Sequence, residues 1–431
     1  MPDTVPAATG RRSEWVLLAV LTAVQFCHIL DFVIIMPLGP QLMRSFGIGA
    51  SKFALLVSAY TFSAAITGLF AASVMDRFDR KRMLLVLLAG FAVGTLLCGL
   101  AGSFALLMAA RVAAGACGGV LAGVVFAIIG DQIPPERRGR ATGVVMAGFS
   151  AASVLGLPLG LSVAERHGWQ APFVLLSALT TGVVLAGALA LPPMRRHLSA
   201  PRGKSPMRDL WAVAREPSHL RAFGFTTALM FAAFTVVPFL SPYLTFNAGV
   251  PESRLDLIYL AGGLVTLFTG PAMGWLADRF GHARVFRITA VVSIVPIVAV
   301  TNLPPVGLPL VLTVTTMMMV LGSGRMISAT ALVTGVVLPA RRGSFMSLNA
   351  AVQQGAAGLA AFVGGLMIGR AADGRMVGYA RVGVLAIAAN LLTLWLVRRL
   401  REVKPEPATV LEAGAPPLAA PLEAPRDAAA D

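Results

Sequence analysis

His28 and Asp31 are the two residues whose chemistry fits their surroundings least. They lie in the stretch QFCHILDFVIIMP, residues 25–37, which is otherwise almost entirely apolar. A charged residue at the centre of a membrane span costs roughly 2.5–3.5 kcal/mol on insertion scales, so it normally faces a cavity or a partner. Gln25, His28 and Asp31 are spaced three apart and therefore share one face of a helix. The pattern indicates proton transfer inside a membrane, although His28 could equally hydrogen-bond a backbone carbonyl.

Arg111 is the candidate partner of Asp31. Asp31 lies six residues before Pro37, where the first apolar run ends, and Arg111 lies seven residues after the fourth run begins. At about 1.5 Å of rise per residue, each lies roughly 10 Å below the same membrane surface. Equal depth allows the two residues to form an opposed Asp31–Arg111 pair. A structural ion pair between two helices is the alternative, and we favour a functional pair because ionisable groups inside membranes are usually functional.

Three further polar residues are candidate cavity contacts. Arg325 lies near the centre of the tenth run, and no acidic residue of the second half is placed to neutralise it. Gln353 and Gln354 lie in the eleventh run, where hydrogen bonding between helices is an alternative use.

The elements that position these residues are membrane spans. The chain has 431 residues, of which 57% are hydrophobic and 13% charged, whereas a soluble protein carries about a quarter charged residues. Apolar runs of about 20 residues, the length that crosses a bilayer as a helix, recur twelve times. They cover residues 15–37, 53–75, 83–101, 104–130, 141–163, 170–192, 221–246, 256–277, 284–303, 307–338, 344–368 and 377–397. The sequence thus predicts an all-α membrane protein with twelve transmembrane helices.

The distribution of Lys and Arg residues predicts the orientation of the protein in the membrane. With the N-terminus inside, the inner segments hold 25 Lys and Arg residues and the outer loops hold 7. Cytoplasmic loops carry the excess of basic residues, so we expect both termini in the cytoplasm and the protein in the plasma (inner) membrane. The net charge of +15 is scattered between the spans, which argues against nucleic-acid binding. The three cysteines all lie in apolar runs, which disfavours a disulfide framework or a metal site.

The chain divides into two halves. We assign an N-terminal tail at 1–14, a first six-helix bundle at 15–192, a basic linker at 193–220, a second bundle at 221–402 and a disordered tail at 403–431. MDRFDRKR at 75–82 matches ADRFGHAR at 277–284, and PERRGRA at 135–141 matches PARRGSF at 339–345. The two offsets are nearly equal, which indicates a duplicated six-helix unit. Secondary transporters are often built this way, with the substrate site between the halves.

These repeats resemble the signature of the major facilitator superfamily, and the resemblance covers about residues 14 to 402. The family's Gly-x-x-x-Asp-Arg-x-Gly-Arg loop is matched by Asp76, Arg77 and Arg80, with Ala72 and Asp79 in place of glycines. In the second copy Gly274, Asp278, Arg279 and Gly281 fit, and RVAAG matches the family's Arg-x-x-x-Gly at Arg111 and Gly115.

Two further motifs are similar to the twelve-helix drug/proton antiporter branch. LDFVIIMPLGP resembles its first-helix signature, and GFSAASVLGLPLG resembles its fifth-helix signature in the variant form found in predicted sugar-efflux and drug-export permeases. Gly148, Gly156, Pro158 and Gly160 carry the second motif, and they allow close helix contact and a bend. Simple tight packing is nearly as good an interpretation of this motif as a role in transport.

The resemblance implies the major facilitator fold, two bundles with both termini inside, and alternating access. It also implies that the first and fourth helices line the central cavity, so we expect the Asp31–Arg111 pair to lie within it. Asp76, Arg77, Arg80, Asp278 and Arg279 would form a cytoplasmic gate, because acids there can accept from helix amides and from arginines of the neighbouring bundle. The alternative is a plain topogenic charged loop. We favour a gate, since the cluster recurs and contains acids that an anchor does not need.

The resulting hypothesis is a monomeric antiporter that exports a small hydrophobic or amphiphilic solute in exchange for protons. It needs no cofactor, because the proton gradient supplies the energy. Few amides lie in the spans, so an apolar solute is favoured over a sugar. An uptake symporter and a sugar or metabolite efflux permease are the alternatives within the superfamily. An intramembrane enzyme lacks a second carboxylate, an ATP-driven pump lacks a nucleotide motif, and a transporter-like receptor stays open.

Overall fold

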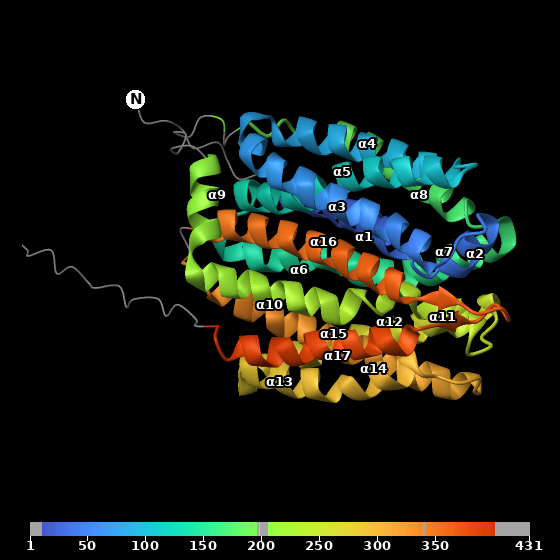
Figure 1. The fold of residues 1–431 in the computed structure, drawn as a ribbon. Coiled ribbons are helices and arrows are strands. Elements are labelled where there is room, and N and C mark those ends of the chain that lie inside the picture. The colour runs from blue at the N-terminus through green and yellow to red at the C-terminus, as the bar shows by residue number, and fades with distance from the viewer. Residues whose placement is uncertain (1–10, 196–197, 199–205, 339–340, 401–431) are drawn as a thin grey trace, which may run out of the picture.

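The protein is an assembly of long, roughly parallel and antiparallel helices (Figure 1). The computed structural model describes residues 11–195, 198, 206–338 and 341–400. Within these ranges, twelve helical segments are long and apolar enough to cross a membrane. Each corresponds to one of the twelve predicted spans, which confirms the all-α membrane fold.

Two sets of helices follow the two halves of the sequence. The first set comprises α1 (Arg11–Ile34), α2 (Gly39–Ser45), α3 (Ala50–Val74), α4 (Arg80–Gly99), α5 (Phe104–Gln132), α6 (Pro135–Ala151), α7 (Leu157–His167) and α8 (Ala171–Ala190). The second comprises α10 (Pro217–Phe234), α11 (Leu240–Phe246), α12 (Leu255–Phe280), α13 (His282–Val292), α14 (Ile294–Thr301), α15 (Leu308–Gly335), α16 (Arg342–Met367) and α17 (Tyr379–Val397).

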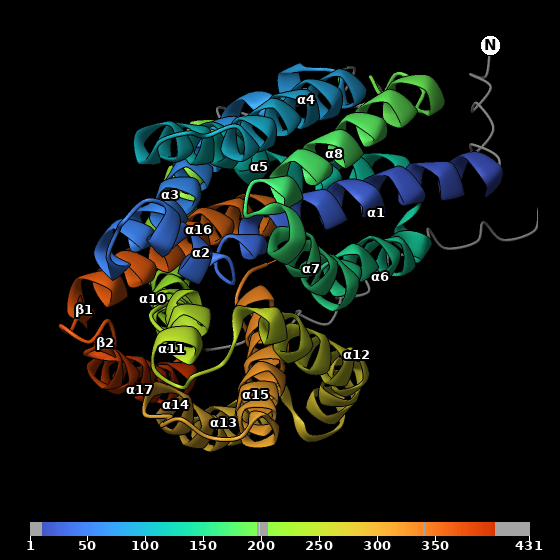
Figure 2. The same ribbon diagram turned by 90° about the vertical axis from the view of Figure 1, so that its right-hand side faces the viewer.

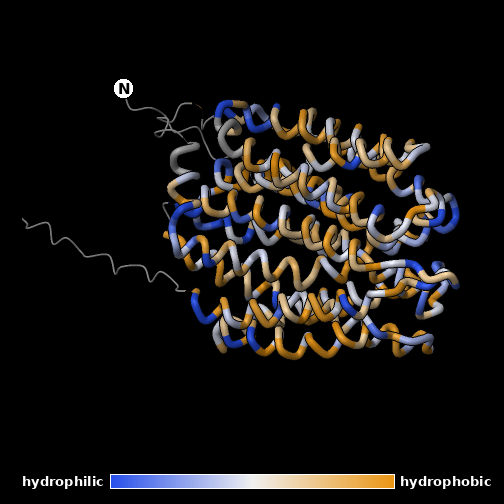
Figure 3. The backbone as a smooth tube through the Cα atoms, viewed as in Figure 1, coloured by the Kyte–Doolittle hydropathy of each residue, from blue (hydrophilic) through white to orange (hydrophobic). Residues whose placement is uncertain are grey.

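Lipid explains both the helices and their apolar exterior. A bilayer offers no hydrogen bonds to the backbone, so a spanning segment must pair its own amide and carbonyl groups, as a helix does. Apolar residues remain on the outside as well as the inside; Leu189, Phe268 and Val86 are among the most exposed. Hydrophilic residues gather at the two ends of the helices, and the middle of the molecule is predominantly hydrophobic (Figure 3).

The two bundles meet along three seams. Figure 2 shows α1 and α3–α8 in one group and α10–α17 in the other. The longest seam pairs α3 with α16, and shorter ones pair α7 with α12 and α2 with α11. At the first seam the Ser58 hydroxyl donates to the Gly358 carbonyl oxygen at 2.8 Å. We call the end of the molecule that carries α2 and α11 the far end, and the end that carries the start of α1 and the end of α17 the near end.

Several spans are interrupted rather than straight. The first span bends between α1 and α2, and the seventh bends between α10 and α11 around a 3₁₀ turn at Val237–Phe239. In the fifth span a π-helical turn at Ala152–Gly156 joins α6 to α7, directly before Pro158. Proline and π turns are established causes of such bends. The π turn therefore interrupts the fifth span within the Gly148–Gly160 motif, where the sequence allows a bend.

Two elements were not predicted from the sequence. The linker contains a short helix, α9 (Pro206–Arg215), that contacts α10 and α16. A small antiparallel pair, β1 (Gly369–Arg370) and β2 (Met376–Val377), joins α16 to α17 at the far end. The predicted tails at 1–14 and 403–431 fall largely or wholly outside the described residues, whereas of the linker at 193–220 only 196–197 and 199–205 do.

Candidate functional site

Asp31 and Arg111 form an ion pair inside the first bundle, as the depth argument predicted. Arg111 Nη1 donates to Asp31 Oδ2 at 2.9 Å and to the Asp31 carbonyl oxygen at 3.3 Å. The Thr95 hydroxyl donates to the other carboxylate oxygen at 3.0 Å. Both charged side chains have 0% of their surface exposed. The pair therefore joins α1 to α5, with Thr95 of α4 as a third contact.

Tyr60 lies beneath the guanidinium of Arg111 and was missed by the sequence analysis. The Arg111 Cζ atom lies 4.4 Å from the centre of the Tyr60 ring, which is a cation–π arrangement. Gly115 makes this approach possible, because a Cβ there would lie 2.3 Å from the Tyr60 carbonyl oxygen. Gly119, four residues later, approaches Ala64 in the same way. The Gly-x-x-x-Gly spacing lets α3 and α5 pack closely and so sets the ring under the cation.

Several polar atoms near the pair are buried without a hydrogen bond in the described part of the chain. They are Gln25 Oε1, both ring nitrogens of His28, the Tyr60 hydroxyl, and Nε and Nη2 of Arg111. His28 and Tyr60 are neighbours, since a Cβ on Gly118 would touch both. Buried polar groups are usually paired, so a concentration of unpaired ones suggests a site that binds or transfers something. We call Gln25, His28, Asp31, Tyr60, Thr95 and Arg111 the buried polar cluster.

The buried polar cluster does not face an open cavity. Cavities of about 770 Å³ and 500 Å³ lie elsewhere in the first bundle, and neither is bordered by Asp31 or Arg111. Both side chains of the pair are 0% exposed, so the pair is closed off in this conformation, and its place in a central cavity stays a prediction. The physical reason is the close packing of α3 on α5, which closes the space around the guanidinium.

The fifth-helix motif packs directly on α1, the helix that carries His28 and Asp31. A Cβ on Gly148 would lie 2.5 Å from the Thr22 carbonyl oxygen, and one on Gly160 would lie 2.4 Å from Ile34 Cδ1. Gly156 faces Leu30 in the same manner, and Pro158 is buried at the start of α7. The motif thus sets the distance between α1 and the fifth span, whatever its role in transport.

Arg325 lies inside the second bundle and has a neutral partner. It is 5% exposed, and its Nη1 donates to Asn390 Oδ1 at 2.7 Å. Asn390 in turn donates to the Ala290 carbonyl oxygen at 2.7 Å, which connects α15, α17 and α13. Among the described residues no carboxylate forms an ion pair with Arg325, as the sequence suggested, but the amide partner was not predicted.

Gln353 and Gln354 lie half-buried on α16. No hydrogen bond in the described part of the chain joins either amide to the buried polar cluster. Their assignment as cavity contacts therefore stays a prediction.

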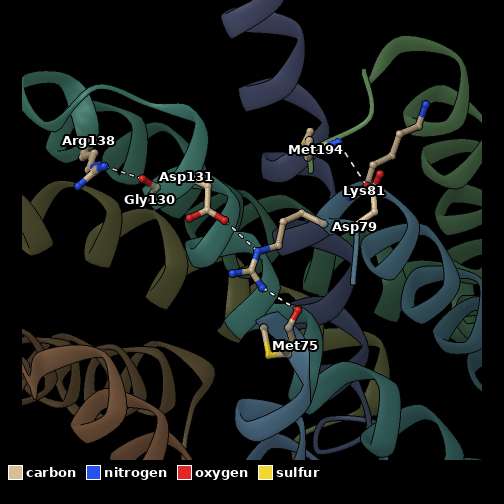
Figure 4. Close-up of polar contacts among 8 residues, drawn as sticks. Met75, Asp79, Lys81, Gly130, Asp131, Arg138 and Met194 are labelled. Carbon is tan, nitrogen blue, oxygen red and sulfur yellow. Dashed lines mark hydrogen bonds and ion pairs between the residues drawn. The ribbon is translucent and has the colours of Figure 1, made fainter. Parts of the chain in front are cut away.

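At the near end, Asp79 caps α4. Its carboxylate accepts from the amides of Lys81 at 2.9 Å and Arg82 at 3.3 Å and from Arg195 Nε at 3.0 Å. It also accepts from the Met194 amide at 3.3 Å (Figure 4). Burial raises the pKa of Asp79, but the hydrogen bonds from Arg195 and the three amides more than offset it and leave the pKa lowered. Asp79 stands where the family signature has a glycine, and it ties the start of α4 to the linker.

Arg80 also makes contacts that stabilise this loop. Its Nε donates to Asp131 Oδ2 at 2.9 Å and its Nη1 to the Met75 carbonyl oxygen at 3.0 Å (Figure 4). Asp131, at the end of α5, was missed because no motif marked it. Arg77 is exposed. The side chain of Asp76 lies outside the described residues.

The second copy of the loop motif does not repeat this geometry. The Asp278 side chain is 77% exposed and lies 3.6 Å from His282 Nε2 on the same helix. The Arg279 guanidinium stacks over the Trp275 ring at 5.2 Å. The recurrence of the motif favoured a gate in both halves, but in the described residues only the first copy forms a network of hydrogen bonds and ion pairs. Asp79, moreover, is bonded within its own bundle and the linker rather than to the second bundle.

The far end is closed across the two bundles. Arg44 of α2 forms an ion pair with Glu252, which lies in the loop before α12. A Cβ on Gly39 would lie 2.7 Å from Pro242 Cγ, so α2 and α11 are in tight contact. The segment around Gly39 and Pro40 thus meets Pro242 of the second bundle at the seam.

Comparison with known proteins identifies the relatives of this chain. A model of the Major Facilitator Superfamily matches residues 21–235 and again 222–426. The chain is 30% identical to the MFS-type transporter YceJ of Bacillus subtilis over 58% of this chain and 64% of that protein. It is 27% identical to the multidrug resistance protein MdtG of Serratia proteamaculans, over 61% of this chain and 66% of that one. The matched region is just under two thirds of these relatives' length.

Solved structures share the fold at low sequence identity. A bacterial homologue of the human lysosomal transporter Spinster, inward-facing and unoccupied, superimposes with a TM-score of 0.71 at 16% identity, over 91% of this chain and 98% of that one. A variant of the nucleoside transporter NupG superimposes with a TM-score of 0.73 at 13% identity, over 90% and 100%. At these identities the likeness concerns the fold alone.

Proposed function

Because the chain belongs to the Major Facilitator Superfamily, we propose that it is a secondary active transporter that exports a small solute in exchange for protons. The solute is hydrophobic or amphiphilic, and the two bundles alternate access to it. In this proposal the protein is a monomer in the plasma membrane, both termini are cytoplasmic, and the proton gradient takes the place of a cofactor.

The observation that carries the proposal is the completely buried Asp31–Arg111 pair in a membrane span. Removing two charges from water is expensive, and such a pair is often no more stable than apolar residues of similar size. A purely structural contact between α1 and α5 could be made more cheaply by apolar side chains. A carboxylate that must exchange a proton, by contrast, needs both a charge and a means of controlling it.

The geometry suggests how a proton could be coupled to a conformational change. Protonation of Asp31 would remove the charge that holds Arg111 Nη1, and Thr95 could remain bonded to the neutral carboxyl. Arg111 would then be free to turn, and its Nε and Nη2 groups would be available to a solute. His28 and Tyr60 lie beside the pair and provide groups that could relay the proton.

Export is supported by the kind of relatives found. A probable sugar efflux transporter of Pasteurella multocida is 23% identical to this chain, and a chloramphenicol efflux pump of Mycobacterium tuberculosis is 27% identical. The scarcity of amides in the spans favours a drug-like or hydrophobic solute over a sugar. A proton-coupled uptake symporter and a sugar efflux permease are the competing assignments.

Proton release tests the coupling directly. The purified protein in detergent would be exposed to a panel of lipophilic compounds in weak buffer, and released protons would be measured. Asp31→Asn is the test variant, because the amide keeps the size of the carboxyl and can still accept from Thr95. Asp373→Asn is the matched control, since Asp373 is exposed in the turn between β1 and β2.

We expect at least one compound to release protons from the wild type and from Asp373→Asn, but not from Asp31→Asn. Equal release from Asp31→Asn would show that another group carries the proton. Direction requires a second measurement, in which vesicles with a proton gradient are loaded with the active compound. Export against the proton flow supports the antiporter, whereas accumulation together with protons would establish the symporter instead.

A further inference from the structure

The 770 Å³ groove at the near end of the first bundle has the shape and charge of an amphiphile site. It lies between the end of α3, the start of α4 and the middle of α5, and it opens sideways. Its wall is apolar and is formed mainly by Ala71, Met75, Met83, Val86, Leu87 and Val120. The mechanism proposed above makes no use of this groove.

The groove runs along the direction of the membrane normal. Leu87 lies seven residues beyond the start of α4, which places it about 10 Å below the near-end surface. Val120 lies twelve residues before the end of α5, which places it about 18 Å below that surface. An occupant would therefore have its polar part at the near end and an apolar chain reaching into the hydrocarbon. Val86 is strongly exposed, so the groove is accessible from the lipid side.

The rim of the groove is positively charged. Arg77, Arg82 and Arg195 border it, and Asp79 is the acidic residue among the lining side chains. The carboxylate of Asp79 is already bonded to Arg195 and to backbone amides, as Figure 4 shows for the Met194 amide. Arg77 and Arg82 are exposed, and neither forms an ion pair within the described ranges. Two guanidinium groups are thus available above an apolar groove.

We propose that this groove binds an anionic phospholipid, with the phosphate between Arg77 and Arg82 and an acyl chain along α4. Arginine suits phosphate because its planar fork offers several donors. The three cations against one engaged carboxylate complement a negative headgroup, and the apolar wall complements a hydrocarbon chain. The site joins the loop before α4 to the linker through the Asp79–Arg195 contact, so a bound lipid would brace both segments.

Binding to the purified full-length protein tests the proposal. Native mass spectrometry would count adducts of phosphatidylglycerol and of phosphatidylcholine with the same acyl chains. The double variant Arg77→Gln/Arg82→Gln removes the rim charges. The matched control is Arg284→Gln/Arg287→Gln, which removes two exposed charges from α13, the corresponding helix of the second bundle, away from the groove.

Each basic residue near an anionic headgroup contributes about fivefold to binding, so the double variant should bind phosphatidylglycerol about 25-fold less tightly. The control variant should bind it as the wild type does, and phosphatidylcholine binding should be weak throughout. A third variant, Val86→Trp, fills the groove and should reduce phosphatidylglycerol binding with the rim charges intact.

Three outcomes would overturn the proposal. An equal loss in both double variants would show unspecific attraction to the basic end of the protein. Displacement of the lipid by glycerol 3-phosphate would show a phosphate site that does not need an acyl chain. Failure of phosphatidylglycerol to bind the wild type would leave the groove to another occupant, such as this chain's own linker. None of these results bears on proton release at Asp31.

Discussion

Replacing Arg111 with methionine should destabilise the protein far more than its loss of contacts suggests. The change leaves Asp31 buried, with Thr95 as its remaining side-chain hydrogen-bond donor and no opposite charge beside it. Breaking one side of a buried ion pair typically costs about 3–5 kcal/mol, because the remaining charge stays uncompensated. The double variant Asp31→Asn/Arg111→Met removes both charges, so it should recover most of that loss and remain within about 1–2 kcal/mol of the wild type.

The assay is equilibrium unfolding of the purified protein in mixed micelles at neutral pH, with helix content as the signal. Arg375→Gln is the matched control, since Arg375 forms an exposed pair with Asp373 at 3.5 Å and should change stability by less than about 1 kcal/mol. If Arg111→Met alone cost less than about 1 kcal/mol, Asp31 would not need its partner. That result would mean that Asp31 is already protonated in this conformation, and the coupling scheme would have to begin from the neutral acid.

Three other perturbations have defined outcomes. Gly115→Ala should lower the melting temperature and cost about 1–3 kcal/mol of stability, because its Cβ would lie 2.3 Å from a backbone carbonyl oxygen of α3. Gly130→Ala on the same helix has open space around the new Cβ, so it should leave the melting temperature unchanged. Asp79→Ala should cost about 1–2 kcal/mol of stability at pH 7. Because the folded-state pKa of Asp79 is lowered, the stability difference from the wild type should have its full size above about pH 4 and disappear as the pH falls further. Thermal unfolding of both proteins from pH 3 to 7 would measure it. Arg44→Gln should lower the stability by less than about 1 kcal/mol, and high salt should abolish this loss because the ion pair with Glu252 is partly exposed. A loss that persisted in high salt would indicate a stronger contact between the two bundles.

Depth in the membrane was predictable from the sequence, and rotation about the helix axis was not. The ends of the apolar runs are marked by polar residues, and the constant rise of a helix converts sequence position into depth. Depth, together with the family's arrangement of the first and fourth helices, therefore sufficed to pair Asp31 with Arg111. Tyr60 and Thr95 were missed because spans that are apolar on all sides carry no signal of which face points inward. Only the Gly115–Gly119 spacing hinted at the face of α5 that receives α3.

The sequence also did not predict those partners of buried arginines that are neutral or that lie outside a recognisable motif. Asn390 is an ordinary amide in a long apolar run, and nothing in its neighbourhood marks it as the acceptor for Arg325. Asp131 ends α5 without belonging to a recognisable motif, yet it pairs with Arg80. The two copies of the loop motif look alike in sequence, but they differ in geometry because Asp79 in the first copy caps α4, whereas Gly281 in the second has a positive φ of 91° and offers no side chain.

The neutral partner of Arg325 has an electrical consequence. The first bundle's buried charges cancel, since Asp31 compensates Arg111, but among the described residues the second bundle retains one buried cation that only an amide solvates. Moving a full elementary charge across a membrane potential of 100 mV changes the free energy by about 2.3 kcal/mol. Any tilting of the second bundle that carries Arg325 through part of the field would therefore be biased by voltage. The resting potential, and not only the pH difference, would then set how often each side of the membrane is open.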